Sequence, residues 1–200
     1  MHAYKPQVIS AAPKRRPSPL SVPLSTTLKA AMMAALTGAL ALVQVPLPFS
    51  PVPITGQTLG VMLAGTICGP WGGALSMLGY LALGCLGFPV FAGGQSGLAT
   101  LAGPTGGYLL GFAIGAWTTG ILATWTRTRK HLFLANIVGA VVVLNLSGIV
   151  YLSWSARMPL AKAFMLGTAP FLPGDIIKAS VATQVGKRLR TAQKRLDIAR

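Results

Sequence analysis

Acidic residues are almost absent from this sequence. Of its 200 residues only two are acidic, Asp175 and Asp197, and charged residues of both signs make up only 10%. Soluble globular domains carry about 25% charged residues, so the composition excludes an ordinary soluble domain. Hydrophobic residues make up 52% of the chain. Several apolar runs of about 15 to 22 residues match the length that crosses a bilayer core as a helix, which predicts a polytopic membrane protein.

The side chains of most enzyme chemistry are scarce as well. The chain has two cysteines, Cys68 and Cys85, which lie in apolar runs and behave there as small hydrophobic residues. No Cys/His cluster has metal-ligand spacing, and no phosphate loop of the G-x-x-x-x-G-K-[ST] type occurs. We therefore expect neither a metal nor another cofactor, and any uphill transport must draw on a partner or an ion gradient.

One short motif resembles a catalytic site but has no neighbouring base. Residues 94–97, Gly-Gln-Ser-Gly, match the G-x-S-G nucleophile motif of intramembrane serine proteases. A nucleophilic serine needs a neighbouring base. The two histidines, His2 and His131, are predicted on the opposite side of the membrane. We interpret the match as a chance occurrence in a glycine-rich loop and expect no enzyme activity.

Basic residues dominate the charge and occur in clusters. The net charge of +15 would suit a nucleic-acid partner, but the positions favour a membrane instead. Clusters beside apolar runs are typical of cytoplasmic loops that face anionic lipid. They are, from the N-terminus on, Lys5, Lys14, Arg15, Arg16 and Lys29; Arg127, Arg129 and Lys130; and Lys187, Arg188, Arg190, Lys194, Arg195 and Arg200. We expect membrane lipid, and no nucleic acid, as a partner.

Six membrane-spanning helices are predicted, at about residues 25–45, 57–68, 73–87, 103–125, 132–154 and 169–186. The sixth is too polar for hydropathy alone, but Pro173-Gly174-Asp175 resembles a helix start. Six crossings put both termini and their basic clusters in the cytoplasm, whereas five would leave the basic C-terminus outside. The fold class is therefore an all-α bundle of six transmembrane helices at residues 25–187. It lies between a disordered basic tail at residues 1–24, which lacks the apolar core of a signal peptide, and a second basic tail at residues 188–200.

Two loops are expected to cover the outer face of the bundle. The first, residues 46–56, contains four prolines, so it cannot be helical and should fold back over the bundle. The second begins a glycine-rich stretch at residues 88–111, whose glycines permit positive φ and close backbone approach. Irregular backbone near lipid must be covered by protein or line a wet cavity, which predicts a lid. The alternative is an ordinary connector. Four further glycines at intervals of four, Gly103, Gly107, Gly111 and Gly115, predict a packing groove on the helix that follows.

Asp175 and Lys178 are the candidate site. They lie three residues apart, so they share a helix face. An Asp or Lys costs about 2.5 to 3.5 kcal/mol at the bilayer centre, so an ionisable residue in a span is by default a functional hypothesis. The alternative is a structural pair that neutralises itself. Around them we expect an outward-facing solute site, in which Phe91 and Tyr108 form an apolar wall. Neutral hydrogen-bonding groups are expected from two glutamines, Gln57 and Gln95.

The first span carries small residues on two adjacent stripes. Ala30, Ala34 and Gly38 form one stripe, and Ala31, Ala35 and Ala39 form the other. Small residues at every fourth position allow close helix contact in lipid. The stripes predict either packing within the bundle or a docking face for another membrane protein.

Three motifs together resemble the BioY family, the biotin-specific substrate-binding (S) components of energy-coupling-factor (ECF) vitamin transporters. They are Phe-Pro-Val-Phe-Ala-Gly-Gly at residues 88–94, the segment 103–112 around Gly-Pro-Thr-Gly-Gly-Tyr, and Phe-Leu-Pro-Gly-Asp-Ile-Ile-Lys at residues 171–178. The resemblance covers roughly residues 25–187. It implies a six-helix component of the bacterial cytoplasmic membrane that captures biotin from outside. Such components normally work with a transmembrane coupling protein and two ATPase subunits.

The resemblance also implies residue roles. Asp175 and Lys178 would bind the ureido end of biotin, and the loops would close over its ring and tail. For the carboxylate the glycine loop offers backbone N–H groups at Gly94 or the side chain of Gln95. Ala31 and Ala35 would dock the coupling protein. The alternatives are an S component or secondary carrier for another small water-soluble vitamin, and a structural membrane subunit without a ligand.

Overall fold

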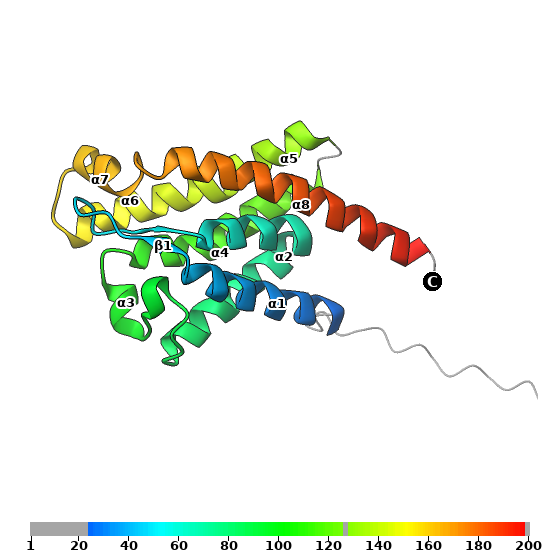
Figure 1. Ribbon diagram of the computed structural model, residues 1–200, viewed down its shortest axis with the longest axis horizontal. Coiled ribbons are helices and arrows are strands. Elements are labelled where there is room, and N and C mark those ends of the chain that lie inside the picture. Colours follow the sequence, from blue (N-terminus) through cyan, green and yellow to red (C-terminus); the bar gives the residue numbers. More distant parts are fainter. Residues whose placement is uncertain (1–23, 126–127, 199–200) are drawn as a thin grey trace, which may run out of the picture.

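The computed structural model describes residues 24–125 and 128–198, with the backbone alone at 194 and 196–198. The predicted N-terminal tail therefore lies almost wholly outside the described residues. The fold is a helical bundle with one short β-hairpin (Figure 1). Its long helical elements are α1 (Leu24–Ala41), α2 (Gln57–Cys85), α4 (Gly106–Thr124), the run of α5 (Arg129–Asn136), the π-helical η2 (Ile137–Val143) and α6 (Leu144–Ser155), and α8 (Leu172–Ile198). The short ones are β1 (Gln44–Val45), β2 (Ile54–Thr55), the 3-10 turn η1 (Ala92–Gly94), α3 (Leu98–Ala102) and α7 (Leu160–Gly167).

Four of the described helices are long and apolar enough to cross a membrane: Leu24–Ala41, Gln57–Cys85, Gly106–Thr124 and Arg129–Ser155. The chain is thus all-helical with several helices capable of spanning a membrane. The predicted count was six. The two further crossings correspond to the second half of α2, which is continuous with the first half, and to α8, which is too polar to qualify by composition. The six-crossing arrangement stays a prediction.

Helix α2 reverses direction in its middle. Gly69 has φ 72° and ψ −171°, outside the helical region, and Pro70 follows it. Gln57 donates a hydrogen bond to the hydroxyl of Tyr80, 23 residues further on. In a straight helix these residues would be separated by roughly 34 Å, so the two halves must run antiparallel. The predicted spans 57–68 and 73–87 are these halves, and the second one ends at Cys85.

The glycines of α4 lie against α6. A Cβ on Gly107 would come within 2.2 Å of the Tyr151 Cβ, and one on Gly111 within 2.1 Å of the Ser147 Oγ. Glycine is therefore needed for the close approach of these two helices. The predicted packing groove is confirmed at these positions and at Gly115, which faces the backbone of Gly139. The prediction was wrong for Gly103, which precedes α4 and caps the end of α3.

The two stripes of α1 have different surroundings. Ala30, Ala34 and Gly38 are buried against the bundle, whereas the neighbouring stripe of Ala31, Ala35 and Ala39 is exposed. The helix ends at Ala41, short of the predicted residue 45. The reason is the hairpin: Gln44 and Val45 already pair with Thr55 and Ile54.

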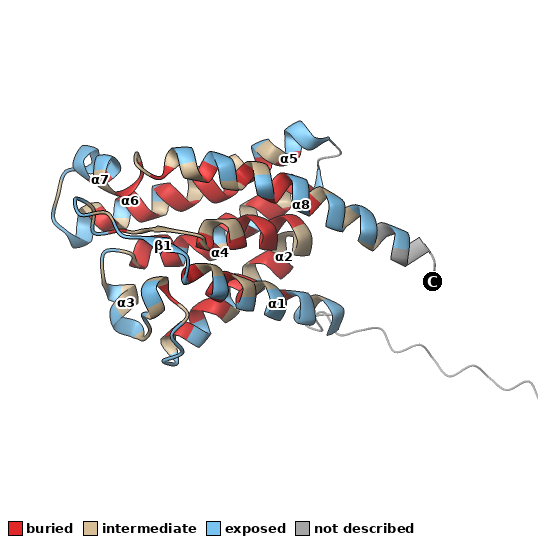
Figure 2. Ribbon diagram, in the orientation of Figure 1, coloured by how far each residue is buried: buried red, intermediate tan, exposed pale blue. Residues whose placement is uncertain are grey.

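The two ends of the bundle differ (Figure 1). One end carries the hairpin, α3 and α7, and the other carries the start of α1, the start of α5 and the end of α8. Helix α8 continues beyond the predicted end at residue 186 as far as Ile198, and its last turns project from the bundle (Figures 1 and 2).

Candidate functional site

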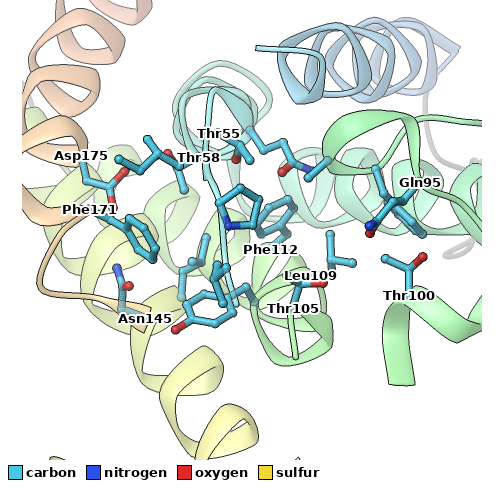
Figure 3. Close-up of a pocket in the computed structure, with 18 of the residues that line it drawn as sticks. Thr55, Thr58, Gln95, Thr100, Thr105, Leu109, Phe112, Asn145, Phe171 and Asp175 are labelled. Carbon is cyan, nitrogen blue, oxygen red and sulfur yellow. The ribbon is translucent and has the colours of Figure 1, made fainter. Parts of the chain in front are cut away.

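A cavity lies beneath the hairpin, inside the end of the bundle that carries α3 and α7. The lining atoms surround about 610 Å³ of empty space, part of it open to the outside. The walls lie close together, so the space between them is narrow. The wall is formed by the hairpin with its loop, the loop before α3, helices α2, α3, α4, α6 and α8, and the residues just before α4 and α8. Figure 3 shows Asp175, Phe171 and Asn145 at one end and Gln95 and Thr100 at the other, with Leu109 and Phe112 between them.

Asp175 and Lys178 meet at one end of the cavity. Asp175 is 2% exposed, and its Oδ1 lies 3.0 Å from the Lys178 Nζ. The Lys178 ammonium also donates to the Thr55 carbonyl (2.7 Å) and to the Thr58 hydroxyl (2.9 Å). Thr58 in turn donates to Asp175 Oδ1 over 3.0 Å. All three ammonium donors are therefore used within the protein.

The second carboxylate oxygen of Asp175 is left for a ligand. Both hydrogen bonds that the carboxylate accepts end on Oδ1. Within residues 24–125 and 128–198, Oδ2 accepts no hydrogen bond. Asp175 lines the cavity. A carboxylate oxygen that faces the cavity and accepts no bond from the described residues is open to a donor, so this end of the cavity favours a ligand that brings an N–H or O–H group.

Asn145 provides a second polar group beside this end. It is 5% exposed, its Oδ1 accepts from Thr168 (2.9 Å), and its Nδ2 donates to the Val141 carbonyl (2.7 Å). An amide nitrogen has two N–H groups. Since Asn145 lines the cavity, the second N–H can reach a ligand acceptor.

The apolar wall contains both predicted aromatic residues. The Phe91 side chain is fully buried, with its ring edge-on to Tyr80 at 5.6 Å. Tyr108 is also buried, and its hydroxyl donates to the Gly167 carbonyl over 2.6 Å. Gln57, which is 3% exposed, donates to Tyr80, and Tyr80 donates to the Val90 carbonyl (2.9 Å). This chain ties the start of α2 to the loop that carries Phe91.

The two loops over the cavity meet each other. The proline loop folds back as predicted: Ser50 donates to the Leu166 carbonyl (2.7 Å), and Val52 is buried in the cavity wall. The glycine loop takes positive φ at residues 93, 94 and 97. A Cβ on Gly93 would lie 2.6 Å from the amide of Gln44, so the loop and the hairpin are in contact. Together they cover the cavity at this end of the bundle.

Most of the predicted site residues line one cavity: Asp175, Lys178, Gln57, Phe91, Gln95 and Tyr108. Gly94 does not line it, because the loop turns there and leaves Ala92 and Gln95 as its wall residues. Ala31 and Ala35 belong to the exposed stripe of α1, away from the cavity. Sequence reasoning missed Thr55, Thr58 and Asn145 as wall residues. For Asn145 the signal was its depth within an apolar span, but the two threonines carried none.

Known proteins resemble this chain along most of its length. The sequence profile of the BioY family matches residues 14–195. A protein named biotin transporter BioY from Rhizobium etli is 44% identical over 156 residues, covering 73% of this chain and 82% of that protein. One from Thermotoga maritima is 35% identical over 156 residues, covering 78% and 89%.

Among solved structures, the crystal structure of the S component for biotin from an ECF-type ABC transporter superposes with a TM-score of 0.78 at 31% identity. The match covers 84% of this chain and 91% of that one. Fold, motifs and sequence agree over nearly the same residues. The chain belongs to the BioY family.

Proposed function

We propose that this chain captures biotin outside a bacterial cytoplasmic membrane and carries it inward as the S component of an ECF-type transporter. The observation that most supports this proposal is the buried Asp175, whose Oδ2 is free at one end of a largely apolar cavity. Membership of a family whose named relatives are biotin transporters supports biotin as the solute. The chain is a transporter subunit and not an enzyme.

The ureido ring of biotin fits the charged end of the cavity. It presents N–H donors and one carbonyl oxygen. A carboxylate that accepts a ureido N–H makes a charge-assisted hydrogen bond, about twice as strong as a neutral one. Asp175 Oδ2 takes this role. The free N–H of Asn145 is placed to serve the ureido oxygen. Lys178 orients Asp175, and can reach the ureido oxygen itself only by giving up one of its three bonds.

The fused rings and the aliphatic tail fit the middle of the cavity. Its walls there are apolar and include Leu109 and Phe112. The narrow space between these walls suits a slender ligand and excludes water around it. The space between the walls is narrow, so the segments that cover it must move apart to admit a ligand. The hairpin and the glycine loop are these segments, and they are in contact at Gln44 and Gly93.

A six-crossing arrangement with both termini in the cytoplasm places this cavity on the outer side. The reversal of α2 supports the count by supplying two crossings. A groove between α5 and α8 supports the orientation: Arg129, Lys187, Arg188 and Arg195 line it, at the end where α1 begins (Figure 1). Basic residues of this kind favour the cytoplasmic face.

The exposed stripe of α1 is the proposed docking face for the ECF coupling protein. Ala31 and Ala35 present no bulk, so another helix can approach closely in lipid. The ATPase subunits of the complex would supply the energy, because the sequence contains no phosphate-loop motif.

A binding screen on the purified protein tests the solute. Biotin, thiamine, riboflavin and pantothenate are titrated separately by calorimetry. We expect saturable binding of biotin alone. Tight binding of another vitamin would identify an S component or carrier for that solute. Binding of none would favour a structural subunit and would contradict the proposal.

A further inference from the structure

The cavity is charged at one end only. Among the described residues that line it, Asp175 and Lys178 are the sole ionisable side chains, apart from Tyr108, whose hydroxyl is bonded to Gly167. Both charged groups lie on α8 at the same end (Figure 3). The other end is formed by Gln95, Thr100 and Thr105.

The uncharged end leads to the outside. A second hollow adjoins it and shares five wall residues: Pro53, Ala92, Gln95, Thr100 and Thr105. The hollow is polar through Gln44 and the threonines, and its described lining holds no cation. The basic residues of the outer loop, Arg157 and Lys162, are exposed and line neither space. We call this end the mouth of the cavity.

The groups at the mouth are weak partners for an anion. Gln95 is exposed, and its side chain makes no hydrogen bond with the described residues. Thr100 already donates its hydroxyl to the Ser96 carbonyl (3.0 Å). A carboxylate buried without a cation is costly, whereas one that stays hydrated at an open mouth loses little. A ligand with a carboxylate tail would therefore keep that group in water.

We propose that this protein recognises the ureido head of biotin and disregards the charge of its tail, so that biotin derivatives amidated at the carboxyl group are also ligands. The proposal rests on the proposed function. An amide retains the carbonyl acceptor that Gln95 can serve and adds an N–H that Gln95 can accept. Biotinyl-lysine, in which the carboxyl group of biotin forms an amide with a lysine side chain, belongs to this class of ligand.

Calorimetry on the full-length purified protein tests the proposal with matched ligands. Biotin, biotinamide and biotinyl-lysine alter only the tail, and 2-iminobiotin alters only the head. We expect both amides to bind within roughly tenfold of biotin, because no ion pair is lost. If a cation of the protein paired with the carboxylate of biotin, the amides would lose roughly thirtyfold or more in affinity. A loss of affinity of that size would overturn the inference.

The comparison with 2-iminobiotin separates the proposal that biotin is the ligand from the proposal that the charge of its tail is disregarded. We expect 2-iminobiotin to bind far more weakly than either amide, because its protonated imino group, a hydrogen-bond donor, replaces the ureido oxygen that would accept from Asn145. If biotin itself fails to bind, the proposed function is wrong. If biotin binds and the amides do not, the proposed function stands and this inference is wrong.

A gain-of-charge variant tests the position of the mouth. Gln95→Arg supplies the missing cation and should raise the preference for biotin over biotinamide by about fivefold or more, an effect that shrinks with salt. Leu98→Arg is the matched control, since Leu98 is exposed on α3 and lines neither space. An unchanged preference in Gln95→Arg would show that the tail lies elsewhere.

Discussion

Helices α2 and α8 are joined by two polar clusters of different kinds. At the cavity, Thr58 bonds to Asp175 and Lys178. Eight residues further along α2, Thr66 donates to Asn136 on α5 (3.1 Å), and Asn136 donates to Thr183 on α8 (3.2 Å). The second cluster is neutral and buried, and its residues line no cavity among those described.

The difference favours a separate role for each cluster. Neutral hydroxyl and amide groups are the usual means of joining helices within lipid, at about 1 to 2 kcal/mol per bond or less. Joining the same two helices through an Asp and a Lys is more costly, since each charge must be desolvated. The neutral cluster thus shows that ionisable groups are not needed for packing α2 on α8. This supports a ligand role for the charged cluster over a purely structural pair.

The largest expected effect is on the charged cluster. Asp175→Asn removes the charge and keeps the shape of the side chain. We expect biotin affinity to fall at least tenfold, about 1.4 kcal/mol or more, because the ureido N–H loses a charged acceptor. Calorimetry measures the affinity, and gel filtration with a thermal unfolding scan checks that the protein is folded. Unchanged affinity in a folded variant would remove Asp175 from the site.

The next largest effect is expected on α1. Its buried stripe packs against the bundle, and its exposed stripe is the proposed docking face. Ala35→Trp should lower uptake in cells about tenfold while binding by the purified protein stays within a factor of two, because the bulk blocks a close helix contact. The same result is expected for Ala31→Trp. Ala34→Trp, on the buried stripe, should instead unfold the bundle, since overpacking a buried position is destabilising. Equal losses of uptake and binding in Ala35→Trp would mean that this stripe serves packing as well.

A smaller effect is expected at the neutral cluster. Asn136→Ala should lower the free energy of unfolding by about 1 to 2 kcal/mol, because Thr66 and Thr183 lose their shared partner. Biotin affinity should stay within a factor of two. Chemical unfolding in detergent and calorimetry measure the two quantities. A large loss of affinity at constant stability would break the distinction between the clusters.

The smallest effect is expected from Thr58→Val, which deletes the hydroxyl between Asp175 and Lys178. The two charges remain 3.0 Å apart, and Lys178 keeps its bond to Thr55. We expect affinity to fall about threefold, because a single hydrogen bond contributes about 0.5 to 1.5 kcal/mol net. Biotin titrations of Thr58→Val and Asp175→Asn show which of the two side chains contributes more to the affinity. An effect as large as that of Asp175→Asn would mean that Thr58 contacts the ligand itself.

The sequence identified the two candidate site residues that are ionisable within a predicted span. Asp175 and Lys178 stood out because ionisable residues in an apolar span are costly, and both line the cavity. Thr58 and Asn145 did not stand out as site residues, because hydroxyl and amide groups are common in membrane helices and usually bond within their own helix. Gly94 was expected, from the family resemblance, to offer its backbone N–H to the ligand, but the loop residues that line the cavity around that turn are Ala92 and Gln95.

Composition and local pattern determined the helical membrane class, the extended proline loop, the left-handed glycines of the second loop and the pairing of Asp175 with Lys178. These features depend on neighbours close in the chain, such as the three-residue spacing that puts two side chains on one helix face. Only the tertiary structure decided that Lys178 donates hydrogen bonds to Thr55 and Thr58 and that Asp175 keeps one oxygen free. Those contacts join residues more than 100 positions apart, and they depend on how α2 and the hairpin pack against α8.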